Sequence, residues 1–292
     1  LDRSSAASDV YKRQVLLFET LPVSISVALA IPLLLLTEQL LWYPILTLIG
    51  FLTGPLLLNL RLYRRPLPPF AGRRILRAYR ANLSVAAAET IGGSYTSAPI
   101  PLAQGILGAT ASGQATSADK FFRIALFAVT VLSNTLQKWV LEVSYAHGRL
   151  RRHFVAFGLH AALALIGGAA LTVLGPVFSS LLFGEKATPE IAVFLGFGAT
   201  FALTSLTTPF IRNVLVPAGL NRYVLFGTLG AALVGVPLMV FGAQWGLSGI
   251  IAGLAASELV ILAVVVTAGT HHLLLERRSA FALVAPAEGD IA

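Results

Sequence analysis

The chain is built around repeated runs of about 20 mainly apolar residues, and no other feature limits its fold as strongly. As a helix, a run of this length spans a hydrocarbon core about 30 Å thick. Only 12% of the 292 residues are charged, whereas a soluble domain carries roughly a quarter. The charge is therefore too low to cover a globular surface. The sequence predicts an all-α protein, a polytopic transmembrane helix bundle.

Eight spans are predicted, with a polar segment before them and a tail after them. The spans are Val15–Leu36, Leu40–Leu60, Ser84–Leu107, Phe121–Val140, Phe154–Leu174, Ile191–Leu215, Val224–Ala243 and Leu247–Thr270. Residues 1–14 lack the apolar core of a signal peptide. They are expected to be a non-native or disordered N-terminal segment, with the natural start of the protein missing. Residues 271–292 are expected to form a cytoplasmic tail.

Basic residues concentrate in alternate connections between the predicted spans. Fifteen lie after the second, fourth, sixth and eighth spans, against three in or beside the other connections. Lys and Arg accumulate on the cytoplasmic side of membrane proteins, so the asymmetry predicts cytoplasmic arginine-rich loops and a cytoplasmic C-terminus. It also accounts for most of the net charge of +8, which therefore does not indicate a nucleic-acid partner.

The span Phe121–Val140 carries side chains that share one helix face, because they recur at separations of four, three, four and three residues. They are Arg123, Phe127, Thr130, Asn134 and Gln137. The remaining faces of the span are apolar. A mainly polar face along a whole span suits the wall of a wet cavity. Hydrogen bonding between helices at a bundle interface is the alternative.

The span Ser84–Leu107 is unusual for its prolines and polar groups. Pro99 and Pro101 each remove a backbone donor and disturb the preceding turn. The same span holds Glu89, Tyr95 and Gln104. Broken helices at membrane depth are tolerated where they pack in protein or line a cavity, and in transporters they often mark the substrate site. We expect this span to be a moving, cavity-lining helix.

Other ionisable residues inside the spans are functional candidates, because charge at membrane depth is costly. Glu258 lies near the middle of the last span. It could carry a coupling proton or hydrogen-bond to a neighbouring helix. His160 is interpreted as a packing histidine, and Arg212 and Asn213 as residues of the cytoplasmic interface, where Arg snorkels.

No catalytic motif is present. The chain has no cysteine, which excludes a disulfide framework, a thiolate metal site and a cysteine nucleophile. It contains no Walker loop, HExxH or GxSxG pattern. The outer connections, about fifteen residues at most, are short for a membrane glycosyltransferase or polymerase, which needs a loop to hold its acceptor. We expect a protein that is not an enzyme and has no cofactor or metal.

Two stretches carry a family resemblance. They are "GILGATASGQATSADKFFRIALFAVTVLSNTLQKWVLE" and "IRNVLVPAGLNRYVLFGTLGAALVGVPLMVFGAQWGLSGIIAGLAASELVILAV". Over roughly Leu83 to Thr270 the chain resembles Wzx-like O-antigen and lipid-linked oligosaccharide flippases of the multidrug/oligosaccharidyl-lipid/polysaccharide (MATE-like) superfamily. The resemblance implies two lobes of six helices. Residues 84–270 would form the complete second lobe, 15–60 the last two helices of a truncated first lobe, and 61–83 a basic cytoplasmic inter-lobe linker.

The resemblance also implies a function in the bacterial inner membrane. It is the flipping of an undecaprenyl-diphosphate-linked oligosaccharide for cell-surface polysaccharide, such as the O-antigen of lipopolysaccharide, by alternating access. Coupling would use a proton or sodium gradient. The implied substrate-binding residues are Lys120, Arg123, Asn134, Gln104 and Tyr95, and the ion-coupling residues are Glu89 and Glu258. Asp119 is expected to hold Lys120 and to cap its helix.

Two alternatives to the flippase remain open at this point. A drug or cation exporter of the same superfamily should have a more acidic or aromatic cavity. A membrane glycosyltransferase or polymerase is the alternative from a different functional class.

Overall fold

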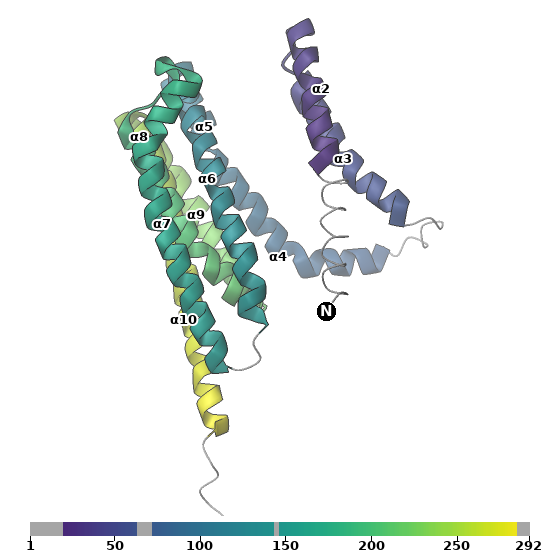
Figure 1. Ribbon diagram of the computed structural model, residues 1–292, viewed down its shortest axis with the longest axis vertical. Helices are drawn as coiled ribbons and strands as arrows, with labels where there is room; N and C mark the ends of the chain where they lie inside the picture. Colours follow the sequence, from purple (N-terminus) through teal and green to yellow (C-terminus); the bar gives the residue numbers. More distant parts are fainter. Residues whose placement is uncertain (1–19, 63–71, 143–145, 285–292) are drawn as a thin grey trace, which may run out of the picture. The chain divides into compact units, whose positions relative to one another are not determined.

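The computed structural model describes residues 20–62, 72–142 and 146–284, and these are helical almost throughout (Figure 1). No strand occurs among them. Within these ranges, four helical segments are long and apolar enough to cross a membrane: Ala109–Leu141, Leu150–Phe183, Ile191–Leu215 and Asn221–Leu275. Leu21–Thr37 and Trp42–Leu57 are shorter apolar helices. The predicted all-α, polytopic helix bundle is confirmed.

Contacts divide the chain into two units, Leu1–Arg77 and Ala78–Ala292. In the first unit, α2 (Leu21–Thr37) packs against α3 (Trp42–Leu62). The two helices approach closely at Gly50, where a Cβ atom would lie 2.7 Å from Ser26 Oγ. Most of their leucine side chains point outward, as expected for a hairpin surrounded by lipid tails.

The second unit contains six long helices and the short elements that join them. The long helices are α4 (Gly72–Ser97), which begins before the boundary, α6 (Ala109–Leu141), α7 (Ala146–Phe183), α8 (Ile191–Pro209), α9 (Asn221–Gly242) and α10 (Gly246–Val284). The short elements are α5 (Pro99–Leu102), the π-helices η2 (Ala103–Leu107) and η4 (Phe210–Leu215), and the 3₁₀ turns η3 (Glu185–Ala187) and η5 (Ala243–Trp245).

Helix ends differ from the predicted span ends. Helix α6 begins at Ala109 rather than Phe121, and α10 continues to Val284 through much of the predicted 271–292 tail. Hydropathy marks only the part of a helix that fits in lipid, whereas these helices extend beyond it with good helix formers such as Leu, Ala and Lys. Helices α9 and α10 belong to one continuous apolar segment, and the chain reverses its direction between them at η5.

The proline-containing span is interrupted, as predicted. Helix α4 ends at Ser97, and α5 and η2 follow it. Pro99 and Pro101 have no N–H for the carbonyls of Tyr95 and Ser97, so the regular α-helical bonding cannot continue. This region is not among the segments long and apolar enough to cross a membrane uninterrupted.

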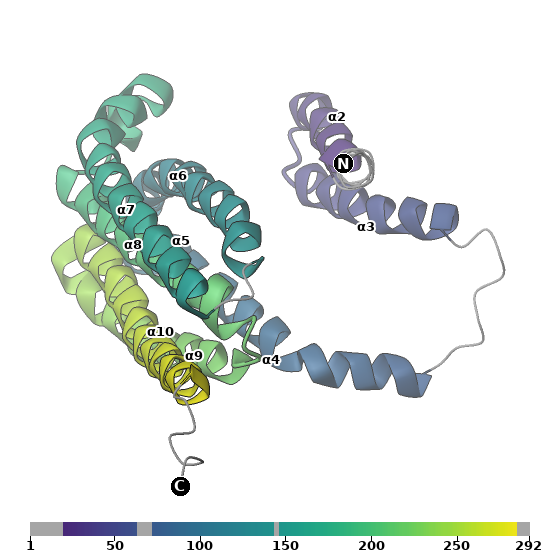
Figure 2. The same ribbon diagram turned by 60° about the horizontal axis from the view of Figure 1, so that its bottom comes forward.

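Small residues bring the helices of the second unit into close contact. Helix α9 packs along α10, and α7 along α8 (Figure 2). A Cβ atom on Gly249 would overlap the carbonyl of Gly242, and one on Gly198 would meet Gly168 O at 2.6 Å. Such backbone approach is typical of membrane helix pairs. The core between these pairs is formed by buried side chains of α8 and α10, namely Phe194, Phe197, Phe201, Ile250, Ile251 and Leu254.

The second unit has a different set of turns at each of its two ends. Elements η2, η3 and η5 lie at one end, here called the Gly246 end, where η2 contacts η5 and α6 contacts η3. The turn between η4 and α9 lies at the other, here called the Gly219 end.

Candidate functional site

The buried carboxylate of Glu258 joins three helices in the second unit. Its Oε1 atom accepts a hydrogen bond from Tyr95 Oη of α4 at 2.7 Å. Its Oε2 atom accepts one from Thr204 Oγ1 of α8 at 3.1 Å. Glu258 is only 6% exposed and Tyr95 only 4%. Among the side chains that the structure describes, no basic group forms an ion pair with this carboxylate.

Glu258 also lies at membrane depth. It follows Gly246 by twelve residues, or about 18 Å along α10, which is near the middle of a hydrocarbon core about 30 Å thick. A carboxylate in such a place is costly unless it is compensated. Here the compensation comes from two hydroxyl groups rather than from a positive charge. A carboxylate with this environment can take up and release a proton or bind a small cation.

Glu89, the other predicted coupling residue, is not part of this cluster. It is exposed on α4, and no hydrogen bond or ion pair of its carboxylate occurs among the described residues. The structure therefore brings one of the two predicted acids together with Tyr95. Tyr95 was predicted to bind sugar. In the structure its hydroxyl group donates to the Glu258 carboxylate instead, so Tyr95 belongs to the Glu258 cluster.

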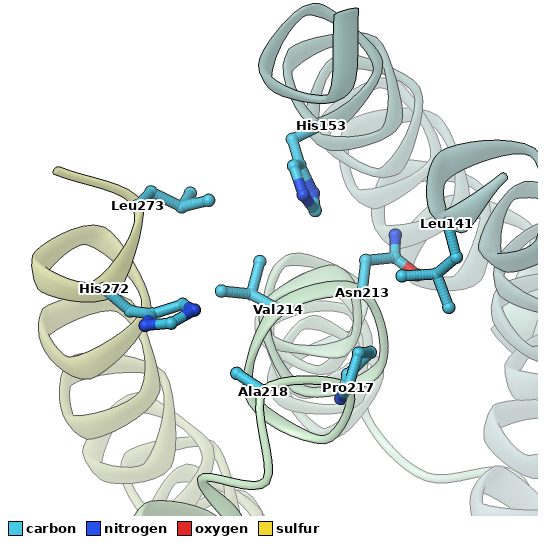
Figure 3. Close-up of a pocket in the computed structure, with 8 residues that line it drawn as sticks. All are labelled: Leu141, His153, Asn213, Val214, Pro217, Ala218, His272 and Leu273. Carbon is cyan, nitrogen blue, oxygen red and sulfur yellow. The ribbon is translucent and has the colours of Figure 1, made fainter. Parts of the chain in front are cut away.

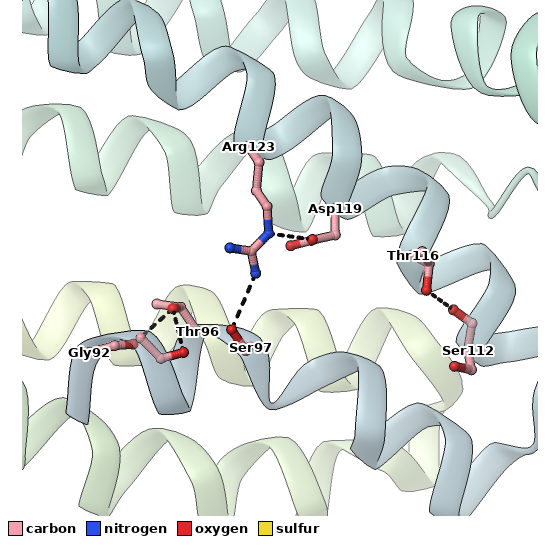
Figure 4. Close-up of polar contacts among 8 residues, drawn as sticks. Gly92, Thr96, Ser97, Ser112, Thr116, Asp119 and Arg123 are labelled. Carbon is pink, nitrogen blue, oxygen red and sulfur yellow. Dashed lines mark hydrogen bonds and ion pairs between the residues drawn. The ribbon is translucent and has the colours of Figure 1, made fainter. Parts of the chain in front are cut away.

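A second polar cluster connects α6 to the end of α4 (Figure 4). Arg123 Nε donates to Asp119 Oδ2 at 2.5 Å, and Arg123 Nη2 donates to Ser97 Oγ at 3.4 Å. Asp119 is 6% exposed, whereas the Arg123 side chain is 48% exposed. The guanidinium group is thus fixed on one edge by a buried acid and remains accessible on the other.

The prediction that Asp119 holds Lys120 and caps a helix is wrong. Helix α6 begins at Ala109, ten residues earlier, so Asp119 lies inside the helix. Residues four apart face each other along a helix, whereas neighbours in sequence do not. Asp119 therefore pairs with Arg123. Lys120 is exposed.

Polar residues in the second half of the α6 face bond to η4. Arg212 Nη1 donates to Asn134 Oδ1 at 2.6 Å, and Gln137 Nε2 donates to the Arg212 carbonyl at 3.3 Å. For Asn134 and Gln137, the alternative of hydrogen bonding between helices is therefore correct. Lys120 and Asn134 are fourteen residues apart on α6, or about 21 Å. The predicted substrate residues thus do not converge on one site, and Gln104 lies exposed in η2.

A small, partly open cavity lies at the Gly219 end (Figure 3). It has a volume of about 160 Å³ and is lined by Leu141, His153, Asn213, Val214, Pro217, Ala218, His272 and Leu273. Asn213 is 2% exposed, and neither atom of its amide has a partner among the described residues. Asn213 therefore faces the protein interior at this end, while its predicted place at the depth of the cytoplasmic interface stays a prediction. The sequence did not predict this cavity, because spacing along one helix does not reveal where α6, α7, η4 and α10 meet.

His160 is buried, as predicted for a packing histidine. It is 0% exposed, and Ser205 Oγ donates to its backbone carbonyl at 2.9 Å. Within the described ranges its Nε2 atom has no partner. Among the same residues, no group of three or more His, Asp or Glu side chains could hold a metal ion.

No protein-family model, curated protein or solved structure matches the chain.

Proposed function

We propose that the protein is a Wzx-like flippase of the MATE-like superfamily. It translocates an undecaprenyl-diphosphate-linked oligosaccharide across the bacterial inner membrane for polysaccharide biosynthesis, without catalysing a covalent step. The observation that carries this proposal is the Glu258 carboxylate, buried at mid-membrane among hydroxyl groups of α4 and α8. Ionisable groups in such positions are found in proteins that move substrates or ions.

Arg123 supports an anionic substrate. Its guanidinium group is accessible at one edge while Asp119 and Ser97 hold the other. Guanidinium groups bind phosphate oxygens in a bidentate manner, and the diphosphate of a lipid-linked glycan offers such oxygens. Lys120, exposed three residues earlier, adds a second positive charge. The lipid tail would remain in the bilayer while the polar head crosses.

In the proposed arrangement the second unit, with its six long helices, is one lobe of a two-lobe transporter. α2 and α3 belong to the other lobe. Glu258 couples movement of the lobes to a proton or sodium gradient. The interrupted segment that follows Ser97 would supply the change in helix direction that alternating access needs.

The Glu258→Gln variant tests the coupling role. The amide oxygen can still accept from Tyr95, and the amide nitrogen can donate to Thr204, so we expect stability to change by less than about 1 kcal/mol. Because an amide does not take up a proton, gradient-driven export should be abolished. The assay is surface glycan in cells whose own flippase is deleted and which express the full-length protein.

Glu185→Gln is the matched control for this variant, because Glu185 is an exposed acid of η3 at the Gly246 end. It should export normally. Normal export by Glu258→Gln would contradict the coupling role. Failure of the unaltered protein to restore surface glycan would contradict the flippase itself.

A drug or cation exporter is the second candidate, and the Glu258–Tyr95 pair favours it. A carboxylate next to an aromatic ring suits an organic cation. The same cells distinguish the two functions when they are also tested for extrusion of a cationic dye. Dye extrusion without restored glycan would select the exporter.

The orientation is also part of the proposal. Because basic residues concentrate in alternate connections, we expect the Gly219 end and the C-terminus to face the cytoplasm. A C-terminal phosphatase that is active only in the periplasm should be inactive, and a C-terminal fluorescent protein that folds only in the cytoplasm should be bright. The reverse pattern would contradict this orientation.

A further inference from the structure

A groove at the Gly219 end has a cationic rim and an apolar floor. It lies between the start of α9 and the second half of α10 and has a volume of about 770 Å³. That volume is within the range of about 300–1,000 Å³ typical of small-ligand sites. Arg222, Tyr223 and His271 line one part of it, and Ala263, Val264 and Ala268 line another.

The two parts of the groove lie at different membrane depths. Counted from Gly246 at 1.5 Å per residue, Ala263 lies about 26 Å along α10 and His271 about 38 Å. The exposed Trp245 marks the opposite interface, where tryptophan is enriched. A hydrocarbon core about 30 Å thick therefore contains Ala263 and Val264 but ends before His271. The apolar floor faces lipid tails, and the cationic rim lies among the headgroups.

Arg222 is held in place at the rim by its neighbour. Its guanidinium carbon lies 5.0 Å from the centre of the Tyr223 ring, and Nη2 donates to Tyr223 Oη at 3.3 Å. Among the side chains that the structure describes, no acid forms an ion pair with Arg222. Most of its five N–H donors are thus available for an anion.

We propose that this groove is a binding site for one anionic phospholipid. Arg222 and His271 bind the headgroup phosphate, and an acyl chain lies along Ala263 and Val264. The depths favour a lipid, because its phosphate lies at the depth of the rim and its hydrocarbon chain lies at the depth of the floor. The charge favours an anionic headgroup, because none of the described residues that line the groove offers a carboxylate to an ammonium group. This proposal does not depend on the transport activity proposed above.

Lipid retention by the purified full-length chain tests the proposal. The protein is incubated in detergent with phosphatidylglycerol or with phosphatidylcholine of identical acyl chains, and bound lipid is counted by native mass spectrometry. We expect one phosphatidylglycerol to be retained in clear preference to phosphatidylcholine. Arg222→Gln should weaken its retention about tenfold, as loss of a charged hydrogen bond does.

Two further variants distinguish lipid retention by the groove from lipid retention by surface charge in general. Arg151→Gln removes an exposed arginine of α7 outside the groove and should retain phosphatidylglycerol normally. Ala263→Phe keeps every charge but fills the apolar floor, so it should lose retention. Because Ala263 is exposed, this change spares the core and keeps the test valid even if Arg222→Gln does not fold.

Each of the following results would overturn the proposal: equal retention of the two lipids, equal loss with Arg151→Gln and Arg222→Gln, normal retention by Ala263→Phe, or displacement of the lipid by inorganic phosphate alone. Preference for undecaprenyl phosphate over phosphatidylglycerol would also overturn it, since the groove would then belong to the transported substrate.

Discussion

Arg123→Ala is expected to lower glycan export about tenfold or more while membrane insertion remains normal. In the proposed mechanism, the free edge of the guanidinium group binds the anionic head of the substrate. A hydrogen bond between charged groups contributes about 1.5–3 kcal/mol, and 1.4 kcal/mol corresponds to a factor of ten in affinity. Export is measured as surface glycan, and insertion as the amount of full-length protein in the membrane fraction. Arg123→Lys should rescue only in part, because a point charge replaces a planar fork.

The ion pair with Asp119 requires a control for this prediction. Arg123→Ala leaves the buried Asp119 carboxylate without its positive partner, which alone destabilises a protein. The double variant Asp119→Asn/Arg123→Ala removes both charges. If Arg123 binds substrate, the double variant should fold normally and still fail to export. If the double variant exports normally, Arg123 serves only to neutralise Asp119.

Of the substitutions proposed for this protein, Gly249→Leu is expected to cause the largest loss of stability. A Cβ atom at this position would overlap the backbone carbonyl of Gly242 on α9. Overpacking typically costs 1–3 kcal/mol, and here no side-chain rotation can relieve it. We therefore expect a loss of about 3 kcal/mol and a fall of about 10 °C in the apparent Tm. Tryptophan fluorescence of the purified protein during heating would measure it, since Trp245 lies beside the reversal.

Gly158→Leu provides the matched control for packing. A Cβ atom at Gly158 of α7 would meet nothing within 4 Å, so the added side chain enters open space. Leucine is also more favourable than glycine inside a helix, by up to about 1 kcal/mol. We expect an unchanged or slightly raised Tm. Equal destabilisation by both substitutions would show that the close contact of α9 with α10 is not the cause.

Much of the fold could be predicted, because apolar runs show which segments lie in lipid and prolines show where a backbone donor is missing. Runs of apolar residues predicted the helices, and Pro99 and Pro101 predicted the interruption that follows Ser97. The starts and ends of helices were less predictable. The twelve residues from Ala109 to Lys120 are small or polar and extend α6 beyond its apolar run, so hydropathy does not include them.

The candidate site was less predictable, because its contacts join residues far apart in the chain. Tyr95 and Glu258 are separated by 163 positions, and their meeting depends on the rotation of α4 and α10 about their axes. Spacing along one helix fixes a face but not the neighbour that the face meets. Asp119 and Arg123 differ in this respect. Their separation of four residues predicts a pair on any helix, and only the misplaced start of α6 obscured it.

The backbone contact between α9 and α10 restricts how these helices can move. Sliding one helix by a single residue, about 1.5 Å, would press a side chain into the carbonyl that Gly242 or Gly249 now accommodates. Gly168 and Gly198 restrict α7 and α8 in the same way. Each pair therefore shifts as a rigid block. Relative displacement is left to the proline-interrupted segment that begins after Ser97. Because Ser97 accepts a hydrogen bond from Arg123, the guanidinium group ties α6 to the residue at which this segment begins.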